Sequence, residues 1–196
     1  MNPSQNPSAL RSKSEITSAL FELMKKYRFS DITVKQIILE SKVSRKTFYR
    51  NFTSKTDVLL AHIEKIILEY VDGLTKLTRN SQDTPSHSLT HEQILPIIFA
   101  KCLENKDLLL YLHRNDLMYL LLEQINTVIN TIHHKFVPAD HYLFAGISPH
   151  QSEYIIRFNV GAVWNVLCKW IGNDMHDDPA EIIRTIDIFL TRIVDQ

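Results

Sequence analysis

The chain has 196 residues, of which 44% are hydrophobic, so it can bury the core of one or two small domains, and its composition excludes a disordered protein. Only four glycines are present, which argues against a sheet-rich fold and favours helices, and the two cysteines do not suggest a disulfide framework. The formal net charge of zero hides two opposite parts, because residues 1–55 carry eleven Lys/Arg and four Asp/Glu (+7), whereas residues 56–196 carry eleven and eighteen (−7). A small basic head on an acidic body indicates that the head binds a polyanion.

The sequence favours a cytoplasmic protein with no membrane partner. Residues 1–14 are polar and contain no apolar run of the kind found in signal peptides. No uncharged stretch approaches the roughly 20 residues that a membrane-spanning helix needs. Two widely separated cysteines also fit a reducing compartment.

The first predicted helix follows an arm, residues 1–11, that we expect to be flexible. Ser12 and Glu15 have the spacing of a capping box, in which two side chains satisfy backbone N–H groups at a helix start. Apolar residues then recur at helical spacing, and they are Ile16, Ala19, Leu20, Leu23 and Tyr27.

Two shorter helices are predicted next. Thr33 and Gln36 have a second capping-box spacing, and the helix that they open has an apolar side. After a break at residues 41–42, Ser44 has the residue type of an N-cap for a third helix that runs to about Asn51. The apolar side of the second helix consists of Val34, Ile37 and Ile38.

The third helix has two unlike faces. Phe48 and Phe52 point together toward the first two helices. The opposite face and its flank carry Arg45, Lys46, Thr47, Tyr49 and Arg50. Two helices joined by a tight turn, the second basic and directed outward, indicate a helix-turn-helix that fits the DNA major groove. A merely solvated cationic face is the alternative, and the +7 charge of the whole segment argues against it.

Residues 56–196 are predicted to be helical throughout. Residues 54–57 cap a long fourth helix, and a polar linker covers residues 80–88. Ser148-Pro149 and Asp178-Pro179 each place a capping residue before a first-turn proline. The later helices are expected at 90–104 (bent at Pro96), 107–114, 116–135, 148–172 and 178–194, with a loop at 136–147.

The last two predicted helices have apolar faces that are wider than one core contact needs. Such a face serves the core and a partner at once, so we expect a twofold homodimer that packs as a four-helix bundle. The residues expected at this interface are Trp170, Ile182, Ile186, Phe189 and Ile193.

Three ordered motifs resemble the N-terminal domain of the tetracycline-repressor (TetR) family. They are Thr33-Val-x-x-Ile37, Val43-Ser44-x-x-Thr47-Phe48-Tyr49-x-x-Phe52 and Ser54-Lys55-x-x-Val58-Leu59. This resemblance covers about residues 12–70. The segments Gly161-Ala-x-Trp164, Trp170-Ile-Gly172 and Asp178-Pro179-x-Glu181 are also similar to the end of many members.

The resemblance implies an all-α bacterial transcription regulator that acts as a homodimer on a palindromic double-stranded DNA operator. Its helix-turn-helix domain would comprise residues 12–55, or extend to about 70 with the start of the fourth helix. Residues 56–196 would bind an unknown small-molecule effector and dimerise. Members of the family usually repress transcription, so the resemblance implies a repressor. The alternative is an activator or co-activator that acts mainly through a protein partner.

The same positions imply roles in DNA binding. Those that would hold phosphates are Thr33, Tyr49 and Lys55. Those that would approach base edges are Arg45, Lys46 and Thr47, which agrees with pairing of Arg and Lys to guanine and of a methyl group to thymine. Lys42, Ser44 and Arg50 complete the expected DNA-binding set, and Phe48 and Phe52 would be structural.

Two positions depart from the family pattern. Lys42 stands where the family usually has glycine, and a left-handed backbone there would cost a lysine about 1 kcal/mol. Lys42 would then either tolerate the strain or add a phosphate contact. Asn51 stands where histidine is common, so we assign it no contact.

Other candidate sites are weaker. His87 and His91 have metal-ligand spacing but no obvious third ligand, and His133-His134 fits a solvated helix end, so we expect no metal and no cofactor. Cys102 and Cys168 are expected to be buried and inert rather than redox sensors. The chain has no Gly-rich phosphate loop, no Gly-x-Ser-x-Gly elbow and no paired His-Glu metal motif, which argues against an enzyme.

An effector pocket is expected in the acidic body, where aromatic residues are frequent. A weakly charged, aromatic-rich lining favours an apolar or aromatic ligand. For each residue, packing in the core is the competing interpretation. The candidates are Phe99, Cys102, Tyr111, His113, Met118, Tyr119, Tyr142, Phe158 and Trp164.

Overall fold

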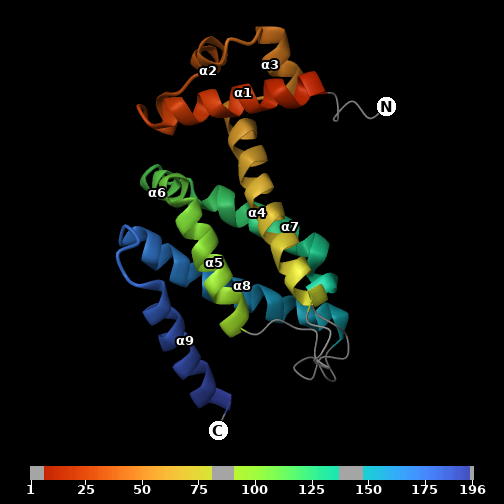
Figure 1. The fold of residues 1–196 in the computed structure, drawn as a ribbon, viewed down its shortest axis with the longest axis vertical. Coiled ribbons are helices and arrows are strands. Elements are labelled where there is room, and N and C mark those ends of the chain that lie inside the picture. Colours follow the sequence, from red (N-terminus) through yellow and green to blue (C-terminus); the bar gives the residue numbers. More distant parts are fainter. Residues whose placement is uncertain (1–6, 81–90, 137–147, 195–196) are drawn as a thin grey trace. The chain divides into compact units, whose positions relative to one another are not determined.

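The structure, a computed structural model, describes residues 7–80, 91–136 and 148–194. Every regular element in these ranges is a helix, which confirms the predicted all-α class. The helices in Figure 1 are α1 (Pro7–Met24), α2 (Val34–Ser41), α3 (Arg45–Asn51), α4 (Lys55–Asn80), α5 (His91–Glu104), α6 (Lys106–Arg114), α7 (Met118–Phe136), α8 (Pro149–Gly172) and α9 (Pro179–Val194). A short 3₁₀ turn, η2 (Phe29–Asp31), precedes α2. The chain divides into two compact units, Met1–Ile67 and Leu68–Gln196, and the division falls within α4.

The first helix begins earlier than the sequence predicted. α1 opens at Pro7, whose fixed φ suits the first turn of a helix, so the end of the predicted arm is helical. The Ser12 hydroxyl donates to the Ser8 carbonyl at 2.9 Å, and Arg11 pairs with Glu15 at 2.8 Å. Both contacts join residues four apart inside one helix, so the predicted capping box at Ser12 and Glu15 is wrong.

The core of the first unit forms where α1 packs against α2 and α3 (Figure 1). The apolar line predicted for α1 is buried as far as Leu23, but Tyr27 lies beyond the end of the helix and is exposed, which corrects its predicted place. The buried apolar side chains are Ile16, Ala19, Leu20, Leu23, Met24, Phe29, Ile32, Ile37, Phe48, Phe52, Val58, Leu59 and Ile63. Burial of these side chains holds α2 and α3 on α1.

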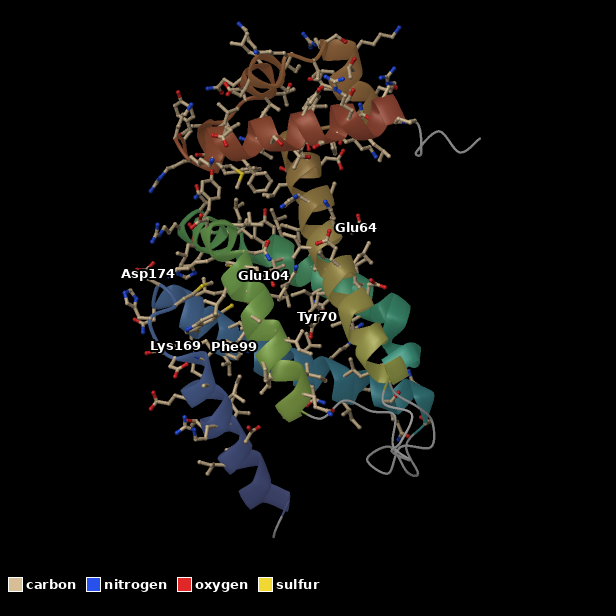
Figure 2. The ribbon with its side chains drawn as sticks, in the orientation of Figure 1. Glu64, Tyr70, Phe99, Glu104, Lys169 and Asp174 are labelled. Carbon is tan, nitrogen blue, oxygen red and sulfur yellow. The ribbon has the colours of Figure 1, made fainter. Side chains whose placement is uncertain are left out.

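The second unit is a bundle with its own core. In it α5 packs against α6 and α9, α6 packs against α7 and α8, and α7 packs against α8. The rings of Phe99 on α5 and Trp170 on α8 meet edge to face, with centroids 4.8 Å apart, and Figure 2 labels Phe99. The buried core cluster is Leu95, Phe99, Leu109, Leu167, Trp170, Ile171 and Met175.

The caps predicted for the second unit are present. The Ser148 hydroxyl accepts from the Gln151 N–H, and the Gln151 side chain accepts from the Ser148 N–H, which confirms the capping box before Pro149. The Asp178 carboxylate accepts from the Ala180 N–H at 3.0 Å at the start of α9. Local capping chemistry therefore sets where both helices begin.

Polar contacts hold the turn between α8 and α9. Asp174, labelled in Figure 2, and Met175 both have left-handed backbones, with φ of 52° and 58°. The Trp170 indole N–H donates to the Asp177 carbonyl at 2.9 Å. Arg114 on α6 donates to Asp174 at 2.7 Å, and this hydrogen bond lowers the pKa of the Asp174 carboxyl. The turn is thereby tied to α6.

Membrane-spanning helices and metal-binding clusters are both absent from the described residues. None of the helices there combines the length and the hydropathy that a membrane-spanning segment needs. No group of three or more His, Cys, Asp or Glu side chains there could hold a metal ion. His87, half of the predicted metal spacing, lies outside the described residues.

Candidate nucleic-acid interface

A cap at its start and aromatic rings on its inner face hold α3 in place. Ser44 is the N-cap, as predicted, and its Oγ accepts from the Thr47 N–H at 3.0 Å. Phe48 is fully buried, with 0% of its surface exposed, and Phe52 is also buried. Their ring centroids lie 6.2 Å apart. The inner face of α3 is therefore committed to the core, and its outer face is left for a partner.

The outer face of α3 is cationic. Arg45, Lys46, Tyr49 and Arg50 are exposed, and α3 contains no acidic residue. The Arg45 guanidinium lies 5.6 Å from the centroid of the Tyr49 ring, one helical turn away. The edge of this ring meets Phe48, with centroids 5.3 Å apart. Tyr49 is thus supported by the buried Phe48 and in turn supports Arg45.

The hydroxyl groups predicted at the interface serve as helix caps. Thr33 Oγ1 accepts from the Gln36 N–H at 3.2 Å, and the Gln36 side chain accepts from the Thr33 N–H at 2.8 Å, so this capping box is confirmed. The Ser44 and Thr47 hydroxyls are hydrogen-bonded at 2.9 Å. Thr33 therefore marks the start of α2, where backbone N–H groups and the helix dipole favour an anion.

Lys42 ends α2 in the strained conformation that the sequence suggested. Its φ is 57° and its ψ is 17°, which is the left-handed region that glycine adopts at no cost. A lysine there loses about 1 kcal/mol relative to glycine. The side chain is exposed on the cationic unit.

The Lys55 ammonium binds backbone carbonyls that precede α2. Its ammonium donates to the carbonyls of Phe29, Ser30 and Ile32, at 2.9 Å for Ser30 and 2.7 Å for Ile32. It also lies 4.9 Å from the centroid of the Phe29 ring. Three donors thus reach three backbone acceptors, so Lys55 makes a structural contact in the protein without DNA, and its phosphate contact stays a prediction.

Two side chains near α3 differ from what the sequence suggested. The Asn51 amide donates back to the Thr47 carbonyl at 2.8 Å, a contact within α3 that the sequence did not suggest. Leu39 on α2 is exposed although it is apolar, and sequence analysis did not single it out. The available signal was its position off the apolar side of α2 formed by Val34, Ile37 and Ile38.

The residues predicted to line an effector pocket do not share one environment. Those in or against the core of the second unit are Phe99, Cys102 and Met118. Those that are half-buried are Tyr111 and Trp164, and those that are exposed are His113, Tyr119 and Phe158. Tyr142 lies outside the described residues. For Phe99 the competing interpretation, core packing, is the one that its contacts support.

The residues predicted at a dimer interface also divide. Trp170 is 1% exposed, and its contacts to Phe99 and to the Asp177 carbonyl place it in the core of its own chain. Its assignment to the interface is therefore corrected. Ile182 and Ile186 are partly buried against the core cluster, whereas Phe189 is exposed. Ile193 belongs to α9, and the structure does not describe its side chain.

Burial controls the chemistry of Cys102. It raises the pKa of this thiol to about 12 from the usual 9.0, so the thiol stays protonated at neutral pH. Burial and the neighbouring Cys102 also raise the pKa of Tyr70, which Figure 2 labels on α4. Burial raises the pKa of Cys168 as well. Tyr70 was not among the predicted pocket residues, although it lies at an apolar position of α4.

Comparison with protein families finds similarity along most of the chain. Residues 16–62 match a family described as "Bacterial regulatory proteins, tetR family". Residues 90–192 match a family described as "Transcriptional regulator C-terminal region", and this match alone spans more than half of the chain. A search of the curated proteins found no match.

Proposed function

The chain belongs to the TetR family of transcriptional regulators and is thus a DNA-binding protein rather than an enzyme, and from this premise we propose that it is a homodimeric repressor of a palindromic operator. The observation that carries the proposal is α3, whose exposed cationic face is anchored by the buried Phe48. In a twofold dimer, two such helices enter major grooves roughly 34–36 Å apart, or a larger fitted spacing. A dimer on promoter DNA represses by occupying it, and the site of action is the cytoplasm.

We assign base reading to the start of α3 and phosphate contacts to its surroundings. Arg45 and Lys46 suit the acceptors of guanine, and the Thr47 methyl suits thymine. The residues assigned to phosphates are Thr33, Lys42, Ser44, Tyr49 and Arg50. Thr33 marks the start of α2, where backbone N–H groups favour an anion, and the others supply hydroxyl or cationic donors on the same unit. Removal of a base-reading residue relaxes sequence preference, whereas removal of a phosphate contact weakens binding to all sequences.

Exposed apolar side chains on α8 and α9 support the dimer. Tyr154 and Phe158 on α8 are exposed, as are Ile188 and Phe189 on α9. Apolar groups of this size on the outside of two helices are typical of an interface between protein chains. We propose that a second copy covers them, which retains Phe189 from the predicted set.

We propose that an apolar or aromatic effector binds the second unit and acts through α4. This helix is continuous from Lys55 in the first unit to Asn80 in the second, so a ligand that displaces its later part would also displace its start. The ligand must bind the two arrangements with different affinity, since otherwise no population shifts. Spin labels on the two copies of α3 measure their separation with and without ligand, and an unchanged separation rejects this account.

Selection of duplexes from a random DNA pool tests the proposed function directly. The wild-type protein is compared with an Arg45→Ala, Tyr49→Ala double variant. Enrichment of a palindrome by the wild type alone supports the proposal and identifies the operator. If neither protein enriches a site, the chain does not read DNA by itself, and the alternative of a TetR-fold activator that needs a protein partner takes its place.

A further inference from the structure

The 3₁₀ turn η2 gathers carbonyl oxygens at one point. Phe29 and Ser30 lie in η2, and Ile32 follows directly as its C-cap. The C-terminal end of a helical turn is its negative end, and the Phe29 carbonyl, which accepts from the Ile32 N–H at 3.3 Å, has a second lone pair for another donor. The carbonyls of Phe29, Ser30 and Ile32 all accept from the same Lys55 nitrogen, so they converge on one position. This geometry is a cation site made of backbone.

The ammonium of Lys55 occupies this site. Lys55 is the first residue of α4, and its nitrogen also lies 4.9 Å from the centroid of the Phe29 ring. An ammonium group has three hydrogens, and three carbonyls receive them. The side chain is half-buried, and burial lowers the Lys55 pKa while the Asp31 carboxylate opposes this shift. The contact is therefore partly shielded from solvent.

The contact joins two points that are distant along the chain. Lys55 lies 26 residues after Phe29 and 23 residues after Ile32. The segment between them contains α2, the strained turn at Lys42 and α3. The entry into the helix-turn-helix and the exit from it are thus fastened together. The Thr53 N–H donates to Asp57 of α4 at 2.7 Å, whereas the attachments of α2 and α3 through Ile37 and Phe48 are apolar and less directional.

We propose that Lys55 is a positioning residue for DNA binding, which closes the helix-turn-helix by filling the carbonyl site of Phe29, Ser30 and Ile32. It acts without touching DNA, through the orientation of α2 and α3 on the first unit. The inference rests on the DNA-binding function for its consequence, but the contact itself exists in the protein without DNA. Lys55 and the cations of α3 therefore have separable roles.

The test compares three full-length variants with the same change of charge. Lys55→Met removes the contact, Lys13→Met removes an exposed charge from α1, and Arg50→Met removes a proposed phosphate contact of α3. Amide hydrogen exchange without DNA measures local opening of residues 32–52. Removal of hydrogen bonds to a charged group is expected to raise the opening equilibrium in Lys55→Met by about ten- to a hundredfold, with no change in the other two.

Salt dependence of operator binding separates the two roles of a lysine. Arg50→Met is expected to reduce the slope of log affinity against log salt by about 0.9 for each phosphate that the variant no longer neutralises. Lys55→Met is expected to weaken binding by no more than its opening factor and to keep the wild-type slope. A reduced slope with unchanged hydrogen exchange in Lys55→Met overturns the proposal and restores a phosphate contact.

A measurement on the wild type covers the case in which Lys55→Met does not fold. NMR of nitrogen-labelled lysine side chains should show one ammonium group whose protons exchange slowly without DNA and whose shift does not change when operator is added. A Lys55 signal that appears or moves only with operator overturns the proposal. If the wild type binds no DNA, the proposed function fails, and the exchange data on the protein alone still decide whether Lys55 closes the helix-turn-helix.

Discussion

Replacing Phe158 with alanine tests the dimer interface, because this side chain is mostly exposed in the single chain. Phe158 is 75% exposed, whereas Phe99, from the same predicted pocket set, is 2% exposed. Full burial of a phenylalanine side chain contributes about 1.5–3 kcal/mol. An interface can still bury the exposed three quarters of the Phe158 side chain, which corresponds to about 1–2 kcal/mol for each copy.

A twofold interface contains each side chain twice, so the expected total is about 2–4 kcal/mol. The dissociation constant of the dimer should then rise by about 30- to 700-fold in Phe158→Ala. The stability of the single chain should change by no more than about 0.5 kcal/mol, because an exposed ring makes few contacts there. The two effects therefore separate association from folding.

Sedimentation over a range of protein concentrations measures association, and denaturant unfolding followed by tryptophan fluorescence measures stability. Both tryptophans, Trp164 and Trp170, lie in the second unit, so the fluorescence reports on that unit. Phe99→Ala is the matched control, since it removes the same ring from the core and should cost about 3–5 kcal/mol.

An unchanged dissociation constant in Phe158→Ala would refute the assignment of this ring to the interface. A wild-type chain that sediments as a monomer at micromolar concentration would reject the α8–α9 dimer altogether. A variant that loses stability as strongly as Phe99→Ala would show that the ring is packed within its own chain.

Three further expectations concern single side chains. Phe48→Ala removes a fully buried ring and should lower the free energy of unfolding of the first unit by about 3–5 kcal/mol. Operator binding should then be abolished, while the tryptophan fluorescence of the second unit stays native. A variant with wild-type DNA affinity would contradict the structural role of Phe48. Tyr49→Phe keeps the ring beside Arg45 and should weaken operator binding by about 0.5–1.5 kcal/mol, because it removes one hydroxyl. Tyr49→Ala also removes the ring and should weaken operator binding more. Equal losses of affinity in a titration of operator DNA would mean that the contact to Arg45 has no effect. Burial raises the Cys102 pKa to about 12 from 9.0, so the unfolded thiol ionises first, and the stabilisation present below about pH 9 is lost as pH rises toward 12. Denaturant unfolding at alkaline pH should therefore show a steeper decline in wild type than in Cys102→Ala, and parallel declines would contradict this.

Local chemistry made most of the helix boundaries predictable. The caps at Thr33, Ser44 and Ser148 depend on residues three positions away, and such pairs can be recognised in sequence. The left-handed backbone of Lys42 follows from the short turn between two helices. The pair Ser12 and Glu15 failed as a cap because the same spacing also occurs inside a longer helix.

Composition does not tell which of two aromatic residues on α8, Phe158 or Trp170, is buried. Trp170 and Phe158 are both aromatic residues on a helix with a wide apolar face. Trp170 is in the core because its ring meets Phe99 on α5 and its N–H meets the Asp177 carbonyl. Phe158 is exposed because no neighbour in its own chain covers it to the same degree. Which part of an apolar face is inward depends on the helices that pack against it.

The sequence by itself determined the all-α class, the helix-turn-helix with its cationic third helix, and the caps that begin α2, α3 and α8, because periodicity and capping act over three or four residues. Only the tertiary structure decided the contacts of Lys55. The resemblance to the TetR family implied a phosphate contact for this lysine at the start of α4. The carbonyls that it binds lie 23 to 26 residues earlier in the chain. Their convergence on one nitrogen is a property of the folded backbone, which no local pattern in the sequence expresses.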